Sequence, residues 1–486
     1  MTSSALVPFQ VTKDNVLCNK STEYLVLEFI GEGCFGKVAK CINLKTSETT
    51  AIKIHNGLAE HYEEVNMLQK LRSLDPVKNN LLEYKDSFIT QDMPCVAFEM
   101  LDRSLWDFVM QRRAPLSLNE IRPIARQLLV AFEALKGVGI IHTDLKPDNV
   151  MLVNQEDEPF RVKLIDFGLA RPASEVKRGM VMQPLGYRAP EVDLGLPICE
   201  AIDMWGLGCI LAFLFFGRDI FCGQSTYDTM RTVCSLLGQP EDHVLDAGSN
   251  TWEFFQKEQP SPYYHTWRLK TPTEHRDATG VWPQTSEWCF DTVGGLEEAI
   301  KSQSNPTDFI EREDTMAFSH LLEWLLSPDG EMRYTPAQAL RHDYITMCHL
   351  TEHMESSSYV QEAYELMVVS PTYDSYEDDD ALKDLLSDME ASIVEEKFSN
   401  IHAIIHEDTV PRGYCDPPTC IKPFRAQKKG FDAERLTPGR APRQNCVTRY
   451  PIDHMDFSSH VHHELKAVSP PEDLGDPFSL GGPGYK

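Results

Sequence analysis

The sequence contains no CxxC pair and no apolar run long enough to cross a bilayer. Its 13 cysteines are scattered without zinc-ligand spacing, so we expect reduced, partly buried thiols. The longest apolar run, residues 206–217, falls short of the ~20 residues that a membrane helix needs and instead predicts a buried core helix. The first 20 residues lack the charged start and apolar core of a signal peptide. We therefore expect no membrane contact and a location in the nucleus and/or the cytoplasm.

Basic residues are also few. Lys and Arg total 46 against 74 Asp and Glu, which gives a net charge of −28. Direct nucleic-acid binding is not expected, because phosphate contacts need a basic surface, although a few placed residues can still bind a nucleotide. Residues 351–400 alone hold 14 acidic and 2 basic residues. We predict that residues 346–486 form a mostly disordered tail, acidic at first and then rich in Pro and Gly.

The rest of the chain divides into a strand-rich part and a helix-rich part. After a polar segment, residues 1–23, which we predict to be flexible, apolar and β-branched residues alternate from Tyr24 onward. Residues 58–72 have helical spacing, and two further strand-like runs follow before residue 100. From Ser117 the pattern is mainly helical. This order predicts an α+β chain with a small β-rich lobe followed by a larger helical lobe.

A glycine-rich stretch, IGEGCFGKV at residues 30–38, has the spacing G-x-G-x-x-G. Glycines let a hairpin backbone lie close over phosphates, but a dinucleotide-binding loop has the same spacing. Such a loop opens a helix, whereas the residues after Gly36 continue as a strand. This context favours a hairpin that covers phosphates.

Lys53 lies on the strand that follows this hairpin. An inward-pointing ammonium group needs an anionic partner, and the candidates are nucleotide phosphates and a glutamate of the next helix. Glu63 and Glu64 compete for that role, and Glu64 fits better because Val65 and Leu68 then take packing positions around it. The alternative for Lys53 is an ordinary exposed strand lysine.

A second polar set lies in IIHTDLKPDNVML, residues 140–152. Asp144 is placed to accept a hydroxyl proton, Lys146 to neutralise charge on a transferred phosphoryl group, and Asn149 to ligate magnesium. Asp166 follows an apolar strand in VKLIDFG and suits a second magnesium ligand. The ordered set is far more specific than any single motif, and it predicts phosphoryl transfer that depends on ATP and Mg²⁺.

Residues 24–345 resemble a eukaryotic protein kinase domain, and among such kinases they resemble the homeodomain-interacting protein kinases of the CMGC group. The supporting stretches are YLVLEFIGEGCFGKVAKC, AFEMLDRSLWDF, IHTDLKPDNVMLV, VKLIDFG, YRAPEVDLGLPICEAIDMWGLGCILA and TWRLKTPTEH. The resemblance implies a two-lobed protein kinase fold. A small antiparallel sheet with one main helix would occupy about 24–100, and a larger helical lobe about 101–345.

The resemblance also implies site residues. Phe98 would be the gatekeeper beside the adenine pocket, and residues 99–101 the hinge. The expected ATP-binding residues are Ile30, Gly31, Glu32, Gly33, Cys34, Phe35, Gly36, Lys37, Val38, Ala51, Lys53, Phe98, Glu99 and Leu101. The expected catalytic residues are Asp144, Lys146, Lys53 and Glu64, and the expected metal ligands are Asn149 and Asp166. Further expected features are a stack of Leu68, His142 and Phe167, a pair of Glu191 with Arg333, and a helical insert over about 238–306.

We interpret two departures from the kinase pattern as linked. Thr143 stands where most such loops hold an Arg that pairs with an activation-loop phosphate, and the resembled family also carries a small residue there. Val181 stands where family members have a phosphorylatable Tyr, and Leu185 replaces a nearby Arg. We therefore predict activity without activation-loop tyrosine phosphorylation.

The tail offers weaker signals. Residues 365–380, ELMVVSPTYDSYEDDD, resemble a SUMO-interacting motif, in which a strand adds to a partner's sheet, but a disordered acidic tail is the favoured interpretation. Residues 381–398 have helical spacing that suits a partner's groove or the kinase domain itself. A basic cluster at 422–430 could aid nuclear import, and a solvated charge run is the simpler alternative.

Two functions remain in competition. The first is a protein kinase for Ser/Thr substrates, indicated by Lys146 in DLKPDN, with limited dual specificity through Tyr autophosphorylation and with transcription factors or co-regulators among its partners. The second is a pseudokinase-type scaffold or transcriptional co-regulator that acts by partner binding. Retention of Lys53, Asp144 and Asp166 favours the first.

Overall fold

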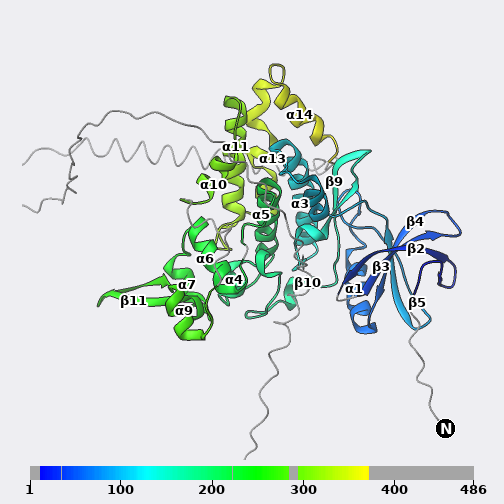
Figure 1. Cartoon of the computed structure of the whole chain (residues 1–486), viewed down its shortest axis with the longest axis horizontal. Coiled ribbons are helices and arrows are strands. Elements are labelled where there is room, and N and C mark those ends of the chain that lie inside the picture. Colours follow the sequence, from blue (N-terminus) through cyan, green and yellow to red (C-terminus); the bar gives the residue numbers. More distant parts are fainter. Residues whose placement is uncertain (1–10, 34–35, 222, 284–293, 371–486) are drawn as a thin grey trace, which may run out of the picture. The chain divides into compact units, whose positions relative to one another are not determined.

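The computed structural model describes residues 11–33, 36–221, 223–283 and 294–370, which form a strand-rich and a helix-rich lobe (Figure 1). The strands are β1 (Val16–Cys18), β2 (Glu23–Gly33), β3 (Gly36–Asn43), β4 (Thr49–His55), β5 (Tyr84–Thr90), β6 (Met93–Glu99), β7 (Ile140–Ile141), β8 (Val150–Asn154), β9 (Glu158–Leu164), β10 (Arg171–Pro172), β11 (Phe255–Ser261) and β12 (Tyr264–Leu269). The α-helices are α1 (Leu58–Leu71), α2 (Leu105–Arg112), α3 (Leu118–Gly137), α4 (Pro190–Asp193), α5 (Ala201–Phe216), α6 (Thr226–Leu237), α7 (Asp242–Ala247), α8 (Thr251–Phe254), α9 (Pro272–Thr279), α10 (Leu296–Gln303), α11 (Phe309–Leu325), α12 (Pro336–Leu340), α13 (Asp343–Thr346) and α14 (Ser358–Met367). Four 3-10 helices are η1 (Pro147–Asn149), η2 (Ala173–Glu175), η3 (Leu185–Tyr187) and η4 (Cys348–His353).

The strand-rich lobe is an antiparallel sheet in the order β1-β2-β3-β4-β6-β5, accompanied by α1. Because side chains alternate across a strand, β4 presents two different faces. Ile52 and Ile54 pack into one apolar core with Val26 and Ala39. The opposite face carries Ala51 and Lys53. The predicted small antiparallel lobe with one main helix is confirmed.

The helix-rich lobe is built around α5, whose residues are almost all buried. This confirms the core helix predicted from the apolar run. Next to it, α3 begins at a capping box in which Ser117 and Glu120 satisfy each other's backbone N–H groups. Among the residues that the structure describes, every helix is too short or too polar to span a bilayer.

Residues 238–306 were predicted to be a helical insert, and this is only partly right. Besides α7 to α10, the insert contains a two-stranded antiparallel hairpin of β11 and β12, in which Phe255 pairs with Leu269 and Lys257 with Trp267 (Figure 1). Alternation in QKEQPS is obscured by polar residues on both faces, so periodicity gave no strand signal there.

The predicted extents of the flexible N-terminal segment and of the disordered tail are both wrong in part. Within the segment 1–23, β1 joins the sheet, with Val16 opposite Leu25 and Cys18 opposite Glu23; residues 1–10 lie outside the described residues. The predicted start of the disordered tail at residue 346 is also wrong, because η4 and α14 follow it and pack on the helical lobe.

Helix α14 is held by apolar and polar contacts. Val360, Ala363 and Met367 are buried in a cluster that includes Leu350. Asn119 Nδ2 of α3 donates to the Tyr359 carbonyl at 2.9 Å. The sequence analysis did not predict this helix, because its short apolar face lies among many acidic residues.

The first three residues of the predicted SUMO-interacting segment, 365–367, are not a strand but the last turn of α14. The remaining residues, 371–380, lie outside the described residues, as do the predicted helix at 381–398 and the basic cluster at 422–430.

Replacing Val360 with Asp should lower the free energy of unfolding by about 3 kcal/mol or more, because the side chain is fully buried and an unpaired charge there has no partner. Val368→Asp is the matched control, since Val368 is 82% exposed. Urea unfolding measures both, and equal, small losses would show that α14 does not pack on the domain.

Candidate active site

The glycine-rich stretch forms a tight antiparallel hairpin between β2 and β3, with Gly31 opposite Val38 and Gly33 opposite Gly36. No helix follows, which agrees with a phosphate-covering hairpin rather than a dinucleotide-binding loop. A Cβ atom at Gly36 would lie 1.9 Å from the Ile54 carbonyl oxygen, so only glycine fits there. Glu32 and Lys37 form an exposed ion pair at 3.1 Å. The predicted contacts Cys34 and Phe35 lie outside the described residues.

The predicted adenine-side residues share one face of the sheet. Val38 is opposite Lys53, and Ala51 is opposite Phe98, so their side chains lie on the same face. Phe98 is buried on this face, and Leu101, just after β6, is also buried. Ile30 on β2 is exposed.

The Glu99 side chain makes two hydrogen bonds that the sequence analysis did not predict. Its Oε1 accepts from Lys163 Nζ and from the backbone N–H of Glu83, both at 2.6 Å. Lys163 is buried on β9, so this ion pair ties the hinge to the strand that leads to Asp166. Because the Glu99 side chain is already engaged, only the backbone of the hinge is left to hydrogen-bond adenine. This contact stays a prediction.

Lys53 lies between two carboxylates. Its Nζ is 2.8 Å from Glu64 Oε2 and 2.8 Å from Asp166 Oδ1. Glu64 is buried and Glu63 is exposed, which settles the competition in favour of Glu64. Burial disfavours the ammonium charge, but Asp166 and Glu64 outweigh it and hold the Lys53 pKa above its ordinary value. Lys53 is thus a partly buried cation with two carboxylate partners, and the alternative of an exposed strand lysine is wrong.

Asp166 is held in a left-handed backbone conformation, with φ of 59°. Burial alone would raise its carboxyl pKa, but the neighbouring Lys53 reverses the effect and the Asp166 pKa is lowered. Gly168 N–H donates to the same Oδ1 atom at 3.3 Å that Lys53 contacts. This leaves Oδ2 for a cation.

The predicted catalytic loop gathers around Asp144. Its Oδ2 accepts from Lys146 Nζ at 3.1 Å and from Asn149 Nδ2 at 2.8 Å. Burial opposes the Lys146 charge, but Asp144 raises the Lys146 pKa above its ordinary value. The loop therefore holds the Asp144 carboxyl group in a fixed orientation.

Asn149 and Asp166 fit a divalent cation by their chemistry. Asn149 Nδ2 also donates to the Asp144 carbonyl at 2.7 Å, so the amide oxygen is the atom left for a ligand role. Together with Asp166 Oδ2, this gives an all-oxygen donor set, which hard cations prefer.

Thr143 is buried in a left-handed conformation with φ of 64°, which is rare for a β-branched residue. Its backbone N–H donates to Asp203 Oδ1 at 3.0 Å, and its hydroxyl donates to the Leu169 carbonyl at 2.8 Å. The side chain therefore ties the catalytic loop directly to the segment that follows Asp166.

The activation segment is held by contacts within the chain. Arg178 Nε donates to the Gly195 carbonyl at 2.6 Å, and Arg188 Nε to the Met182 carbonyl at 3.0 Å. Tyr187 is buried, and its hydroxyl donates to Asp219. Val181, which stands at the usual Tyr position, is 69% exposed.

Two other predicted contacts are confirmed. His142 and Phe167 meet edge to face with ring centroids 5.3 Å apart, and Leu68 is buried in the same core. Arg333 forms a bidentate pair with Glu191, at 2.6 and 3.0 Å.

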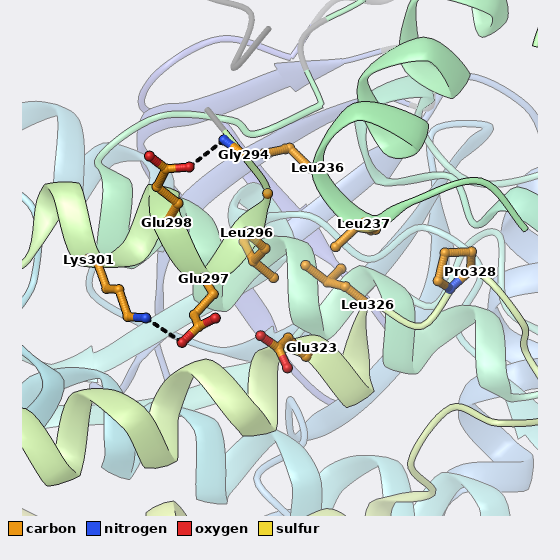
Figure 2. Close-up of a pocket in the computed structure, with 11 residues that line it drawn as sticks. Leu236, Leu237, Gly294, Leu296, Glu297, Glu298, Lys301, Glu323, Leu326 and Pro328 are labelled. Carbon is orange, nitrogen blue, oxygen red and sulfur yellow. Dashed lines mark hydrogen bonds and ion pairs between the residues drawn. The ribbon is translucent and has the colours of Figure 1, made fainter. Parts of the chain in front are cut away.

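A separate pocket of about 620 Å³ lies in the helical lobe, between α6, α10 and the end of α11 (Figure 2). Its apolar wall is formed by Leu236, Leu237, Leu296 and Leu326, and Glu297 at its rim pairs with Lys301 (Figure 2). None of the predicted catalytic or ATP-binding residues lines it, so the pocket is separate from the predicted active site.

Comparisons with known proteins agree with this geometry. A family model described as protein kinase domain matches residues 24–345. Homeodomain-interacting protein kinase 1 of Mus musculus is 39% identical over 369 residues, which cover 74% of this chain and 30% of that protein. The protein of the same name from Caenorhabditis elegans is 36% identical over 74% of this chain and 44% of its own length. Homeodomain-interacting protein kinase 4 of Homo sapiens is 34% identical, over 70% and 57%. The aligned chain thus spans well under two thirds of these relatives.

Proposed function

Because the chain belongs to the protein kinase family, we propose that it transfers the γ-phosphoryl group of ATP to Ser and Thr hydroxyls of proteins. The observation that carries the proposal is the position of Lys53 between Glu64 and Asp166, on the same sheet face as Phe98. Protein kinase domains in general use ATP and a divalent metal, and we propose Mg²⁺ as that metal.

Each polar residue has a role in this proposal. Lys53, oriented by Glu64, binds the α- and β-phosphates, and Asp144 orients the substrate hydroxyl and accepts its proton. Lys146 stabilises negative charge on the transferring group. Asn149 and Asp166 would hold the cation, which supplies charge neutralisation to the phosphates when bound.

The finer parts of the proposal rest on resemblance. The DLKPDN sequence around Lys146 supports Ser/Thr substrates, with limited Tyr autophosphorylation. The relatives are named for interaction with homeodomains, so we propose transcription factors or co-regulators as partners, and the nucleus and/or the cytoplasm as the location. For the tail we propose contact with SUMO or with a partner's groove through residues 365–398, of which residues 365–367 lie in the last turn of α14.

The experiment measures phosphate transfer from ATP to a generic protein substrate, with Asp166→Asn as the control. Asn keeps the shape of Asp166 but removes the charge that faces Lys53 and the cation. Transfer by the unaltered protein and background for the variant support a kinase. Equal background for both would favour the scaffold, and the geometry of Lys53 and Asp144 speaks against that outcome.

We also propose that the activation segment needs no phosphate. Thr143 brings no positive charge to the loop, and its hydroxyl instead contacts the Leu169 carbonyl. Arg188 is engaged with backbone carbonyls of Met182 and Gln183. No positive charge of Thr143 or Arg188 is therefore left that needs a phosphate on the activation segment as its partner.

Thr143→Val removes the hydroxyl but keeps the shape, and should lower kcat by about 3- to 10-fold, the value of one hydrogen bond. Thr143→Ser keeps the hydroxyl and should retain most of the activity. Steady-state kinetics on both proteins give the comparison. A Val variant as active as the unaltered protein would mean that the contact with Leu169 does not matter.

A further inference from the structure

A buried histidine lies beside the Lys53–Glu64 pair and has no part in the function proposed so far. His55 is the last residue of β4, two residues after Lys53, so both side chains lie on the same face of the strand. It is only 4% exposed. Within the part of the chain that the structure describes, neither ring nitrogen has a hydrogen-bond partner.

The His55 ring lies beside the carboxylate of Glu64. His55 Nε2 lies 3.2 Å from Glu64 Oε2. Lys53 Nζ donates its hydrogen bond to the other oxygen, Oε1, at 3.0 Å. Oε2 is buried and accepts no hydrogen bond from any described residue, although Nζ is 2.8 Å away. A buried carboxylate oxygen without a donor is costly, and a small rotation of the imidazole would supply one.

A second histidine packs beside the first. His61 lies on α1, three residues before Glu64, and is also buried. Its ring meets that of His55 edge to face, with centroids 5.4 Å apart and planes at 77°. Burial, and then the neighbouring His55, lower the His61 pKa, which favours a neutral ring. His61 therefore packs against His55 without competing for the carboxylate as a cation.

The backbone of His55 also underlies the glycine-rich hairpin. Gly36 is paired with His55 in the register of β3 and β4, and a Cβ at Gly36 would lie 3.0 Å from His55 Cα. His55 thus touches the end of the hairpin, follows Lys53 on its strand, and faces Glu64.

We propose that His55 is a positioning residue for ATP binding, which acts by donating from Nε2 to Glu64 Oε2. This contact fixes the Glu64 carboxylate so that Oε1 stays directed at Lys53, and Lys53 stays between Glu64 and Asp166. Without it, the Glu64 side chain can rotate and Lys53 shifts toward Asp166, away from the place of the α- and β-phosphates. The inference rests on the proposed function, because it assumes that Lys53 binds those phosphates.

The test is the affinity of the full chain for mant-ATP, a fluorescent ATP analogue, with Mg²⁺ held constant. His55→Leu fills the space without a donor and should weaken mant-ATP binding by about 10-fold, the low end of the range for one hydrogen bond to a charged group. His55→Gln restores an N–H donor and should recover most of the affinity. In steady-state kinetics, His55→Leu should raise KM for ATP more than it lowers kcat, and leave KM for the protein substrate unchanged.

His61→Leu is the matched control, since it removes a buried imidazole from the same cluster whose ring contacts His55. It should change the melting temperature about as much as His55→Leu while keeping mant-ATP affinity. The inference is overturned if His55→Leu binds mant-ATP as well as the unaltered protein, if His55→Gln is as weak as His55→Leu, or if His61→Leu is equally weak. Absence of binding by the unaltered protein would overturn the proposed function itself, and the inference with it.

Discussion

Replacing Asp144 with Asn should lower kcat by about 10²- to 10⁴-fold, the usual contribution of a positioned proton acceptor. Asn retains the size of the side chain and can still accept from Lys146 and Asn149 at Oδ1, but it cannot take the proton of a substrate hydroxyl. The affinity for ATP should change little, because the Lys53 pair with Glu64 and Asp166 is untouched.

Asp148→Asn is the matched control for this measurement. The same substitution four residues on falls on an exposed side chain of the same loop, and should retain most of the activity. If both variants lost activity equally, the loss would reflect damage to the loop rather than removal of a proton acceptor. If Asp144→Asn stayed fully active, the assignment of Asp144 would be wrong.

Replacing Arg333 with Met should lower the free energy of unfolding by about 3–5 kcal/mol, because it leaves the Glu191 carboxylate buried without its cation. Arg333 also donates to the Ala201 carbonyl at 2.8 Å and lies over the Trp205 ring at 5.2 Å. The variant should therefore loosen the end of the activation segment and the start of α5 together.

A double-mutant cycle with Glu191→Gln tests the cause of this loss. Removing both charges should be less damaging than the sum of the two single changes, since no unpaired charge then remains buried. Urea unfolding of the four proteins gives the coupling free energy. Strict additivity would contradict a direct interaction between Arg333 and Glu191.

The sequence predicted those parts of the site that depend on short-range spacing. Asp144, Lys146 and Asn149 lie within six residues, so one loop conformation brings them together. The choice of Glu64 over Glu63 followed from the apolar face of α1, and the structure confirms it. In the first case the spacing within one loop was sufficient for the prediction, and in the second the helical period of α1 was.

Contacts between distant elements could not be predicted in this way. The pair of Glu99 with Lys163, and that of His55 with Glu64, depend on strand register and on how α1 lies against the sheet. The contact of the Thr143 hydroxyl with Leu169 depends on a left-handed backbone conformation that composition does not encode. Helix α14 was missed because ten residues in an acidic context give a weak helical signal.

The most direct test of the account is phosphoryl transfer by protein from which all phosphate has been removed. The protein is treated with a phosphatase that acts on Ser, Thr and Tyr, its intact mass is checked, and the initial rate on a generic protein substrate is measured before autophosphorylation accumulates. We expect the rate of the untreated protein, because Thr143, Arg178 and Arg188 hold the segment through contacts within the chain. The claim that the activation segment needs no phosphate would be contradicted by a rate that falls to the Asp166→Asn background and returns only with phosphate on Tyr187 or Ser174.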